Sequence, residues 1–380
     1  MRGGRRHGER RRGDAETRRQ KKTCRSLSPR FPVSIYMLFM ICLLLSGCTK
    51  NDKMYKESRV LMDTFCTITV VSPSKEKAGQ AIDAGFAEIK KLDTLLNYFS
   101  DESEINAINR AAGIKPVKVS NETLEIIKKM SDIAKATNGA FDATIAPVIK
   151  HWKFSKDSSA SSIPSGKVIE QALRLVDYKK IKINSGASEI YLEAKGMELD
   201  LGGIAKGYAA DKAVDAIRDK GIKAALVAVA GDIRGFGLNL SGQGWKVGIR
   251  NPRPEAESER PWEDIFAVLH LKDRAISTSG DYQRFFIKDG KRYHHILDPE
   301  TGFPADSGLI SVSVIAPEGY LSDSLSTAVF VLGPEQGMTL LESMGLDGVL
   351  IDADKKILVT NNLKKEIEIL NTDFRKADRL

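Results

Sequence analysis

The apolar positions of this chain recur at helical spacing in three stretches. In residues 77–96, large apolar side chains return every three or four positions, which predicts an amphipathic helix. Residues 120–139 repeat the pattern, with a serine suited to an N-cap at the start and an Asn-Gly pair at the end. A third helix is predicted after Gly203 and ends at Gly221. Each helix has one apolar face, which we expect to pack against a sheet.

Shorter apolar stretches between the helices predict strands. They lie at residues 60–71, 180–183, 190–193, 224–230, 245–249, 265–271, 310–315 and 348–351. The run at 224–230 is apolar throughout, which indicates a strand buried on both faces. Helices occur only once or twice among these strands. This order predicts an α+β fold with mixed or antiparallel sheets and flanking helices, in one domain of residues 60–375, rather than a doubly wound parallel sheet.

The beginning of the chain differs in composition from the rest. Residues 1–30 hold twelve Lys or Arg against three acidic residues, whereas the remaining chain has 46 basic and 47 acidic residues. The main body is therefore close to neutral, and its charge does not favour nucleic acid as a partner. An apolar run at 31–45 follows, which is short for a membrane span and typical of a signal-peptide core.

The apolar run ends in Leu45-Ser46-Gly47-Cys48, which resembles a bacterial lipobox. We therefore expect residues 1–47 to be a lipoprotein signal peptide, Cys48 to be lipidated and residues 48–59 to be a tether. A signal anchor or a buried helix is the alternative. The expected location is the cell envelope, on the periplasmic face of a bacterial inner membrane. Processing would leave Cys66 alone, which excludes an internal disulfide and a four-cysteine metal site.

The stretch 279–302, SGDYQRFFIKDGKRYHHILDPETG, combines turn signals with residues that can carry chemistry. Two short strands around an Asp-Gly turn predict a β-hairpin, which explains the turns but not the adjacent His294 and His295. Neighbouring side chains of a strand point to opposite faces, so we expect at most one histidine to face a site. Structural filling is the alternative role of this pair.

Two other motifs could carry chemistry. Gly203 lies at a predicted helix start with Lys206 in the first turn, where free amides bind phosphate; tight packing explains the glycine equally well. Asp323 and Thr327 are four residues apart at the start of an apolar helix, so they share one face. A carboxylate and a hydroxyl in this arrangement can bind Mg²⁺, and a helix cap beside an ordinary threonine is the alternative.

The order of the motifs adds a family resemblance over roughly residues 58–350. The segments are NYFSDESEINAIN from Asn97, GAFDATIAPV from Gly139, DLGGIAKGYAADKA from Asp200, AGDIRGFG from Ala230, SGDYQRFF with HHILDPETGFPA, and DSLSTA from Asp323. In sequence and order they resemble the ApbE family of bacterial flavin transferases. Members of that family bind FAD and Mg²⁺ and transfer FMN to a threonine or serine hydroxyl of a partner protein through a phosphoester bond, releasing AMP.

The resemblance implies a role for particular residues, with FAD in a cleft between two subregions. Mg²⁺ would be held by Gly203, Asp323 and Thr327. The flavin and its phosphates would be bound by Met62, Tyr98, Ala140, Phe141, Asp142, Lys206, His295 and Ile296. His295 would be the base for the incoming hydroxyl, and Asp298 would be a second catalytic residue. Asp63 and Ala230 depart from the family pattern, which usually has glycine at both positions.

The resemblance also implies a partner and leaves alternatives. The acceptor would be a protein with a flavinylation threonine or serine, such as a subunit of a membrane redox complex. One alternative is a Mg²⁺-dependent FAD pyrophosphatase that releases FMN and AMP with water as the nucleophile. Another is a periplasmic flavin-binding lipoprotein without turnover.

Overall fold

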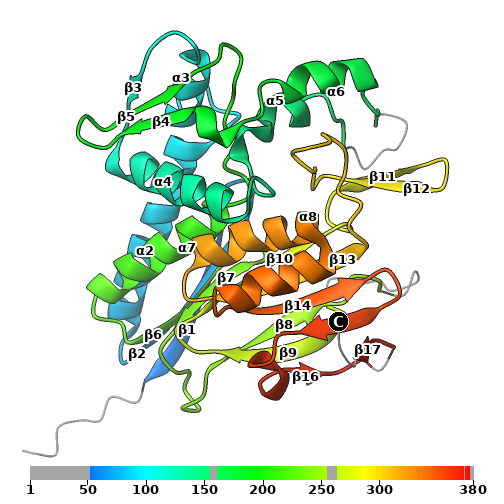
Figure 1. Ribbon diagram of the computed structural model, residues 1–380. Helices are drawn as coiled ribbons and strands as arrows, with labels where there is room; N and C mark the ends of the chain where they lie inside the picture. The colour runs from blue at the N-terminus through cyan, green and yellow to red at the C-terminus, as the bar shows by residue number, and fades with distance from the viewer. Residues whose placement is uncertain (1–51, 155–160, 255–262, 372, 377–380) are drawn as a thin grey trace, which may run out of the picture. The chain divides into compact units, whose positions relative to one another are not determined.

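A nine-stranded sheet organises the computed structural model, which describes residues 52–154, 161–254, 263–371 and 373–376 (Figure 1). Its strands, in spatial order, are β1 (Lys53–Leu61), β2 (Thr64–Ser72), β6 (Ala224–Val229), β7 (Asp232–Phe236), β10 (Ala275–Gly280), β13 (Leu309–Ala316), β14 (Asp347–Asp352), β15 (Lys356–Val359) and β17 (Arg375–Lys376). Neighbours pair antiparallel except β15 and β17, which are parallel. The predicted signal peptide and Cys48 lie outside the described residues.

Three long helices cover one face of this sheet. They are α2 (Lys75–Leu96), α7 (Ala205–Asp219) and α8 (Gly319–Ser343). Their apolar faces and those of β2, β6 and β13 form the main core, in which Ile68, Phe86 and Phe330 are fully buried. Within the described residues, no helix combines the length and apolar character needed to cross a bilayer.

The opposite face of the sheet carries a second, smaller core. A three-stranded sheet of β8 (Trp245–Arg250), β9 (Ile265–Leu271) and β16 (Glu368–Ile369) packs there. Alternate residues of β8, such as Trp245 and Val247, point inward against Ile276 and Ile315 of the large sheet. The two faces together establish the α+β fold that the element order predicted.

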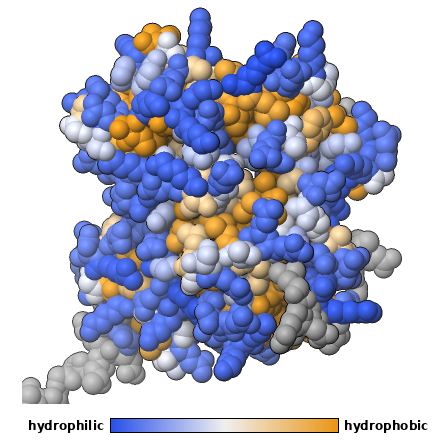
Figure 2. Space-filling view, in the orientation of Figure 1, coloured by the Kyte–Doolittle hydropathy of each residue, from blue (hydrophilic) through white to orange (hydrophobic). Residues whose placement is uncertain are grey.

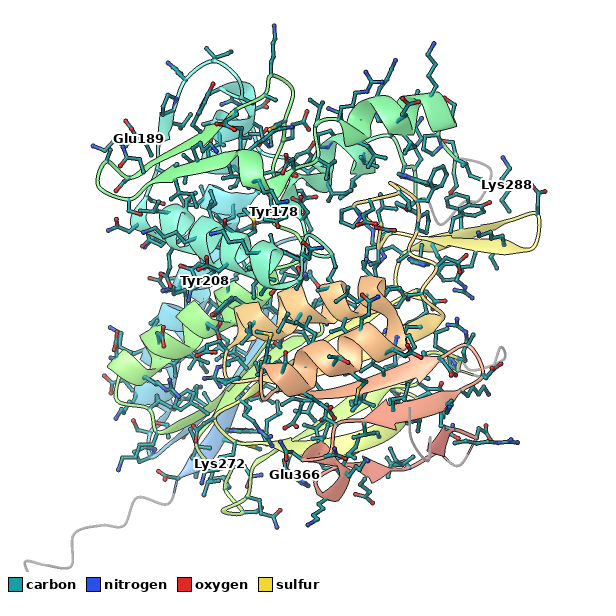
Figure 3. All side chains as sticks on the ribbon, in the orientation of Figure 1. Tyr178, Glu189, Tyr208, Lys272, Lys288 and Glu366 are labelled. Atoms are coloured by element: carbon teal, nitrogen blue, oxygen red, sulfur yellow. The ribbon has the colours of Figure 1, made fainter. Side chains whose placement is uncertain are left out.

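Shorter elements extend the molecule beyond α7 and α8 (Figure 1). The main core continues through α3 (Glu104–Arg110), α4 (Asn121–Ala136), β3 (Val117–Lys118), β4 (Ile181–Asn184), β5 (Glu189–Leu192) and the 3₁₀ turns η1 (Ala143–Ile145) and η3 (Tyr178–Lys180). A third apolar cluster around Trp152 joins α5 (Ala146–Ile149) and α6 (Gly166–Leu173) to the hairpin β11 (Phe285–Lys288) and β12 (Lys291–His294). Lys288 lies at the tip of this hairpin (Figure 3).

The tether predicted at residues 48–59 is too long, because most of these residues belong to a strand. Residues 53–61 form β1, which pairs along its whole length with β2 through a turn at Met62 and Asp63. Both turn residues have positive φ, 52° and 55°, as a tight hairpin turn requires. The single strand predicted at 60–71 is therefore two strands. The polar sequence of β1 concealed it, because an edge strand leaves most of its side chains exposed.

Helices α7 and α8 approach closely, and two glycines make this possible. A Cβ added at Gly207 would lie 2.1 Å from the Gly319 carbonyl oxygen, and one added at Gly319 would lie 2.4 Å from the Gly207 carbonyl oxygen. The Asp211 carboxylate of α7 accepts hydrogen bonds from the backbone N–H groups of Gly319 and Tyr320, at 2.7 and 3.0 Å. This carboxylate caps α8 from outside and fixes the start of that helix against α7.

Candidate active site

A cavity of about 650 Å³ lies where the starts of α7 and α8 meet the ends of the hairpin and of α5. Figure 2 shows apolar side chains exposed across the middle of this face, in the region of α8. Ten of the residues predicted from the sequence line the cavity: Tyr98, Ala140, Phe141, Asp142, Gly203, Lys206, His295, Ile296, Asp323 and Thr327. The structure therefore brings most of the predicted site together from segments far apart in the chain.

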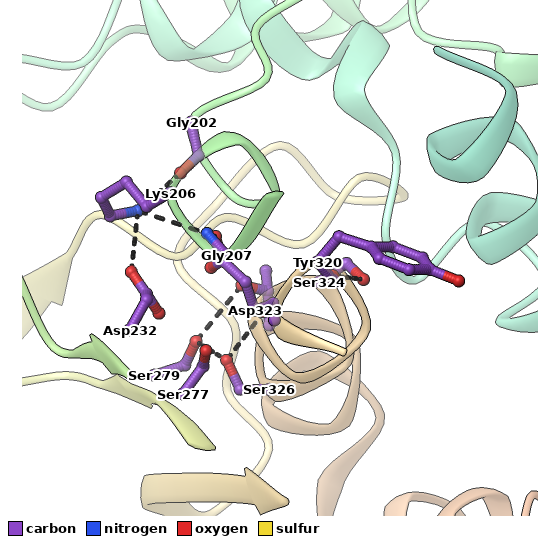
Figure 4. Close-up of polar contacts among 12 residues, drawn as sticks. Gly202, Lys206, Gly207, Asp232, Ser277, Ser279, Tyr320, Asp323, Ser324 and Ser326 are labelled. Carbon is purple, nitrogen blue, oxygen red and sulfur yellow. Dashed lines mark hydrogen bonds and ion pairs between the residues drawn. The ribbon is translucent and has the colours of Figure 1, made fainter. Parts of the chain in front are cut away.

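One side of the cavity, here called the polar wall, is formed by Asp200, Lys206, Asp232, Ser279, Asp323 and Thr327. The Lys206 Nζ donates a 2.9 Å hydrogen bond to the Gly202 carbonyl (Figure 4). It also lies 3.5 Å from an Asp232 Oδ2 and 4.0 Å from an Asp323 Oδ2. Burial alone would lower the pKa of this ammonium, but Asp323 and Asp232 raise it. Lys206 is therefore charged and held between two carboxylates.

Asp323 is buried, with 5% of its surface exposed. Its Oδ2 accepts a 3.0 Å hydrogen bond from the backbone N–H of Gly207, at the close approach of α7 and α8. Burial raises the pKa of Asp323, and the nearby Asp232 raises it further, while Lys206 lowers it. Burial also raises the pKa of Asp200. The polar wall thus contains three carboxylates and one ammonium, so a bound cation would balance its excess of acidic groups.

The donors of the polar wall suit a hard divalent cation. Thr327 Oγ1 lies 3.7 Å from where a Cβ of Gly203 would be, so these two residues and Asp323 share one corner. No three His, Cys, Asp or Glu side chains are grouped as a metal site in the part of the chain that the structure describes. A cation here would therefore depend on hydroxyl, carbonyl and ligand oxygens as well as carboxylate, as Mg²⁺ commonly does.

Asp232 belongs to this wall, although sequence reasoning did not single it out. It is buried, at the first position of β7, and follows the two-residue turn of Ala230 and Gly231. Ala230 adopts a positive φ of 55° without being glycine. The available signal was an aspartate one glycine beyond the apolar strand at 224–230, where a buried carboxylate needs a functional or structural partner.

The adjacent histidines separate as the strand geometry predicted. His294 is buried; its Nε2 lies 3.1 Å from the Ala305 carbonyl oxygen, and its ring packs edge-on against Phe330. His295 lies just beyond β12 and lines the cavity. Burial lowers the pKa of His295 to about 4, helped by the positive charge of Arg284. Its imidazole is therefore neutral, and its Nδ1 has no hydrogen-bond partner among the described residues.

The cavity is also lined by aromatic side chains, here called the aromatic wall: Tyr98, Phe99, Phe141, Trp152 and Phe154. The Tyr98 hydroxyl donates a 2.6 Å hydrogen bond to the carboxylate of Glu198, which also accepts one from Lys150 Nζ at 2.6 Å. Trp152 and Phe154 stack with ring centroids 5.7 Å apart. This wall offers flat apolar surfaces to a planar ligand.

Asp142 also lines the cavity, but its carboxylate is already satisfied by hydrogen bonds. One oxygen accepts from the backbone N–H and the hydroxyl of Thr144, at 2.8 and 2.7 Å. The other accepts from the N–H of Tyr178 at 3.0 Å. Asp142 therefore joins η1 to η3 and shapes the loop that carries Phe141.

The structure does not bring two of the predicted residues to the cavity wall. Met62 lies in the β1–β2 turn, where its N–H donates a 3.1 Å hydrogen bond to Asp93 Oδ2. The carboxylate of Asp298 closes the turn after the hairpin by accepting from the Glu300 N–H at 2.8 Å and the Thr301 hydroxyl at 3.2 Å. Asp298 thereby supports the loop that follows His295 and has the contacts of a structural residue.

Comparison with known proteins shows the family of the chain. The model of the ApbE family matches residues 62–350. The FAD:protein FMN transferase of Treponema pallidum is 31% identical, over 88% of this chain and 96% of its own length. That of Klebsiella pneumoniae is 30% identical, over 86% of this chain and 98% of its own.

Solved structures show the same fold. The crystal structure of the ApbE protein from Thermotoga maritima matches with a TM-score of 0.74 and 31% identity, and it covers 83% of this chain and 99% of that one. The flavin transferase ApbE from Vibrio cholerae matches with a TM-score of 0.73 and 25% identity over the same shares. The match extends over nearly the whole of each relative.

Proposed function

Since the chain belongs to the ApbE family, we propose that it transfers FMN from FAD to a threonine or serine hydroxyl of a partner protein. The acceptor oxygen attacks the phosphorus of the FMN half, the bond from that phosphorus to the bridging oxygen breaks, and AMP leaves with the bridging oxygen. The hydroxyl proton passes to a base. The single observation that carries the proposal is one cavity lined both by charged and by aromatic side chains.

The polar wall is suited to the phosphates. In this proposal Asp323, Thr327 and the Gly203 carbonyl hold Mg²⁺, which would neutralise charge on the pyrophosphate during transfer. Lys206 adds a fixed positive charge beside them, held by Asp232 and Gly202. His295 is neutral and therefore able to accept the proton of the incoming hydroxyl.

The aromatic wall is suited to the flavin. We propose that the isoalloxazine ring lies against Tyr98 and near Phe141, where flat apolar surface is available. Ala140 and Asp142 border the same loop, and Ile296 follows the base on the hairpin side. Met62 and Asp298 support the neighbouring turns in this proposal and do not contact the ligand.

We also propose that the chain is anchored by lipid at Cys48 in the cell envelope, with residues 1–47 removed as a signal peptide. A flavin-accepting subunit of a membrane redox complex would then be within reach as partner. The support is the basic segment, the apolar run and the Leu-Ser-Gly-Cys ending. Cells fed labelled palmitate should label the wild-type chain and not Cys48→Ala; an unlabelled wild-type chain would contradict the anchor.

The transfer itself can be tested with the full chain, FAD, Mg²⁺ and a protein that carries an acceptor threonine. We expect a fluorescent flavin band on the acceptor in a denaturing gel and an equal amount of AMP. A threonine-to-valine acceptor keeps the shape but lacks the nucleophilic oxygen, so the band should vanish. FMN and AMP without a labelled acceptor would favour the pyrophosphatase, and bound FAD without AMP would leave only a flavin-binding protein.

A further inference from the structure

Behind the polar wall, serines of β10 meet serines of α8 in two pairs (Figure 4). Ser277 Oγ lies 2.9 Å from Ser322 Oγ, and Ser279 Oγ lies 2.8 Å from Ser326 Oγ. Each buried hydroxyl needs a hydrogen-bond partner to offset its loss of water, and these serines provide it for one another. Ser279 lines the cavity, whereas Ser326 is buried and does not.

The direction of these hydrogen bonds follows from the number of protons. Ser326 Oγ lies 2.8 Å from the Asp323 carbonyl oxygen, which can only accept, so the Ser326 proton points there. Ser279 must then donate its own proton to Ser326. Ser279 Oγ also lies 3.2 Å from Thr327 Oγ1, and it has no proton left for that contact. Thr327 is therefore the donor.

We propose that Ser279 and Ser326 are positioning residues that orient the Thr327 hydroxyl for a divalent cation. The chain of bonds runs from Thr327 to Ser279, then to Ser326 and to the Asp323 carbonyl. It holds the Thr327 proton on the Ser279 side and leaves the Thr327 lone pairs for the cavity, where a cation needs them. The inference rests on the cation site of the proposed function and adds how the protein prepares its hydroxyl ligand.

A threonine in a helix has another common arrangement, which the structure does not use. It can donate to the carbonyl four residues earlier, here that of Asp323. That oxygen already accepts the Ser326 proton, and the only hydroxyl contact of Thr327 among the described residues is Ser279. The Thr327 hydroxyl therefore donates to Ser279 and not to the backbone of its own helix.

The second serine pair is a built-in control. Ser322 donates to the Gly319 carbonyl at 3.0 Å, so Ser277 donates to Ser322, and the chain ends without reaching Thr327. The two pairs lie two residues apart on β10 and one helical turn apart on α8. Replacing Ser277 or Ser322 by alanine removes one buried hydrogen bond between hydroxyls, as replacing Ser279 or Ser326 does, but it does not change the direction of the Thr327 proton.

Binding of Mn²⁺ alone to the full chain, followed by electron paramagnetic resonance, tests the inference without any turnover. We expect Ser279→Ala to weaken binding about tenfold or more, the lower range for losing a group behind a metal ligand. Ser279→Thr keeps the hydroxyl and should bind within about threefold of wild type. Ser277→Ala should bind as wild type does, although its thermal unfolding temperature should fall about as much as that of Ser279→Ala.

Ser326→Ala separates orientation from direct contact, because Ser326 does not reach the cavity. We expect it to weaken Mn²⁺ binding severalfold while Ser322→Ala has no effect on binding. If Ser279→Ala and Ser326→Ala bind Mn²⁺ as tightly as the control variants Ser277→Ala and Ser322→Ala, the inference is wrong and the proposed function still stands. If wild type and Asp323→Asn both fail to bind Mn²⁺, the cation site itself is wrong and this inference falls with it.

Discussion

The two walls of the cavity are built in different ways. The polar wall comes from the ends of core elements, namely the starts of α7 and α8, the β6–β7 turn and the end of β10. Its Asp232 and Asp323 are buried. The aromatic wall comes from short connections between helices, and its outermost residue, Phe99, is 82% exposed. Buried charges need fixed partners, since an unpaired one is costly. A flat ring can be held by surfaces that adapt.

The comparison implies that the polar wall controls the rate and the aromatic wall controls affinity. Charge that develops during phosphoryl transfer must be met by groups already in position, which a rigid scaffold provides. Stacking on an aromatic side chain contributes similarly before and during the reaction, so it affects binding more than turnover. The following changes test this division, beginning with the largest expected effect.

Asp323→Asn should abolish most of the transfer. The amide can still accept the Gly207 hydrogen bond but offers a cation no charge, so we expect the rate to fall about a thousandfold, equivalent to several kcal/mol of lost electrostatic stabilisation. FAD affinity without metal should change little. Single-turnover release of AMP and titration with FAD measure the two quantities.

Asp211→Asn is the matched control for that variant. Asp211 is also a carboxylate that joins α7 to α8 through backbone N–H groups, but it does not line the cavity. Losing its charge beside Arg234 and at the start of α8 should lower the unfolding temperature and spare the transfer. Equal losses of activity in Asp323→Asn and Asp211→Asn would mean that the effect is structural.

His295→Gln should have the next largest effect. Loss of the base should slow transfer about a hundredfold. Because the pKa of His295 is lowered to about 4, the base is active above that pH and lost as the pH falls through it. With Mg²⁺ saturating, so that the bound cation keeps the Asp323 carboxylate charged, the acid limb of kcat/KM should therefore lie near pH 4 rather than 6.5, and it should disappear in the variant.

The pH dependence also has an internal check. The negative phosphates of bound FAD favour the charged imidazole, so the acid limb of kcat should lie at higher pH than that of kcat/KM. If the wild-type and His295→Gln profiles have the same acid limb, another group is the base.

Sequence reasoning succeeded where the signal was local. Apolar periodicity located α2, α4 and α7 to within a few residues, and the Asp-Gly turn located the hairpin. Strand alternation correctly predicted that only one of His294 and His295 faces the cavity. Spacing on one helix face brought Asp323 and Thr327 together, because four residues return to the same side of a helix.

The features that the sequence did not predict depend on contacts between residues far apart in the chain. The strand β1 has a polar sequence and is stabilised by its pairing with β2, which no local pattern reports. Asp232 joins the site because the start of β7 lies beside Lys206 of α7, 26 residues earlier in the chain. The serine chain requires β10 and α8 to pack at one register, and sequence alone shows only scattered serines.

The smallest expected effect is on the aromatic wall and uses two similar tyrosines. Tyr98 donates to Glu198, which also binds Lys150. Tyr208, labelled in Figure 3, donates at 2.9 Å to Glu125, which also binds Lys212. Only Tyr98 lines the cavity. Each tyrosine-to-phenylalanine change removes one hydrogen bond to a carboxylate, of about 1.5–3 kcal/mol, and keeps the ring.

Tyr98→Phe should therefore weaken FAD binding by about two- to fivefold, because the ring is held less firmly. The single-turnover rate of FMN transfer from bound FAD should stay within about twofold of the wild-type rate. Tyr208→Phe should lower the unfolding temperature and leave FAD affinity unchanged. Calorimetric titration with FAD and single-turnover kinetics distinguish the two. If Tyr98→Phe instead lowers the single-turnover rate tenfold with unchanged affinity, the aromatic wall takes part in the reaction itself, and the division between the walls is wrong.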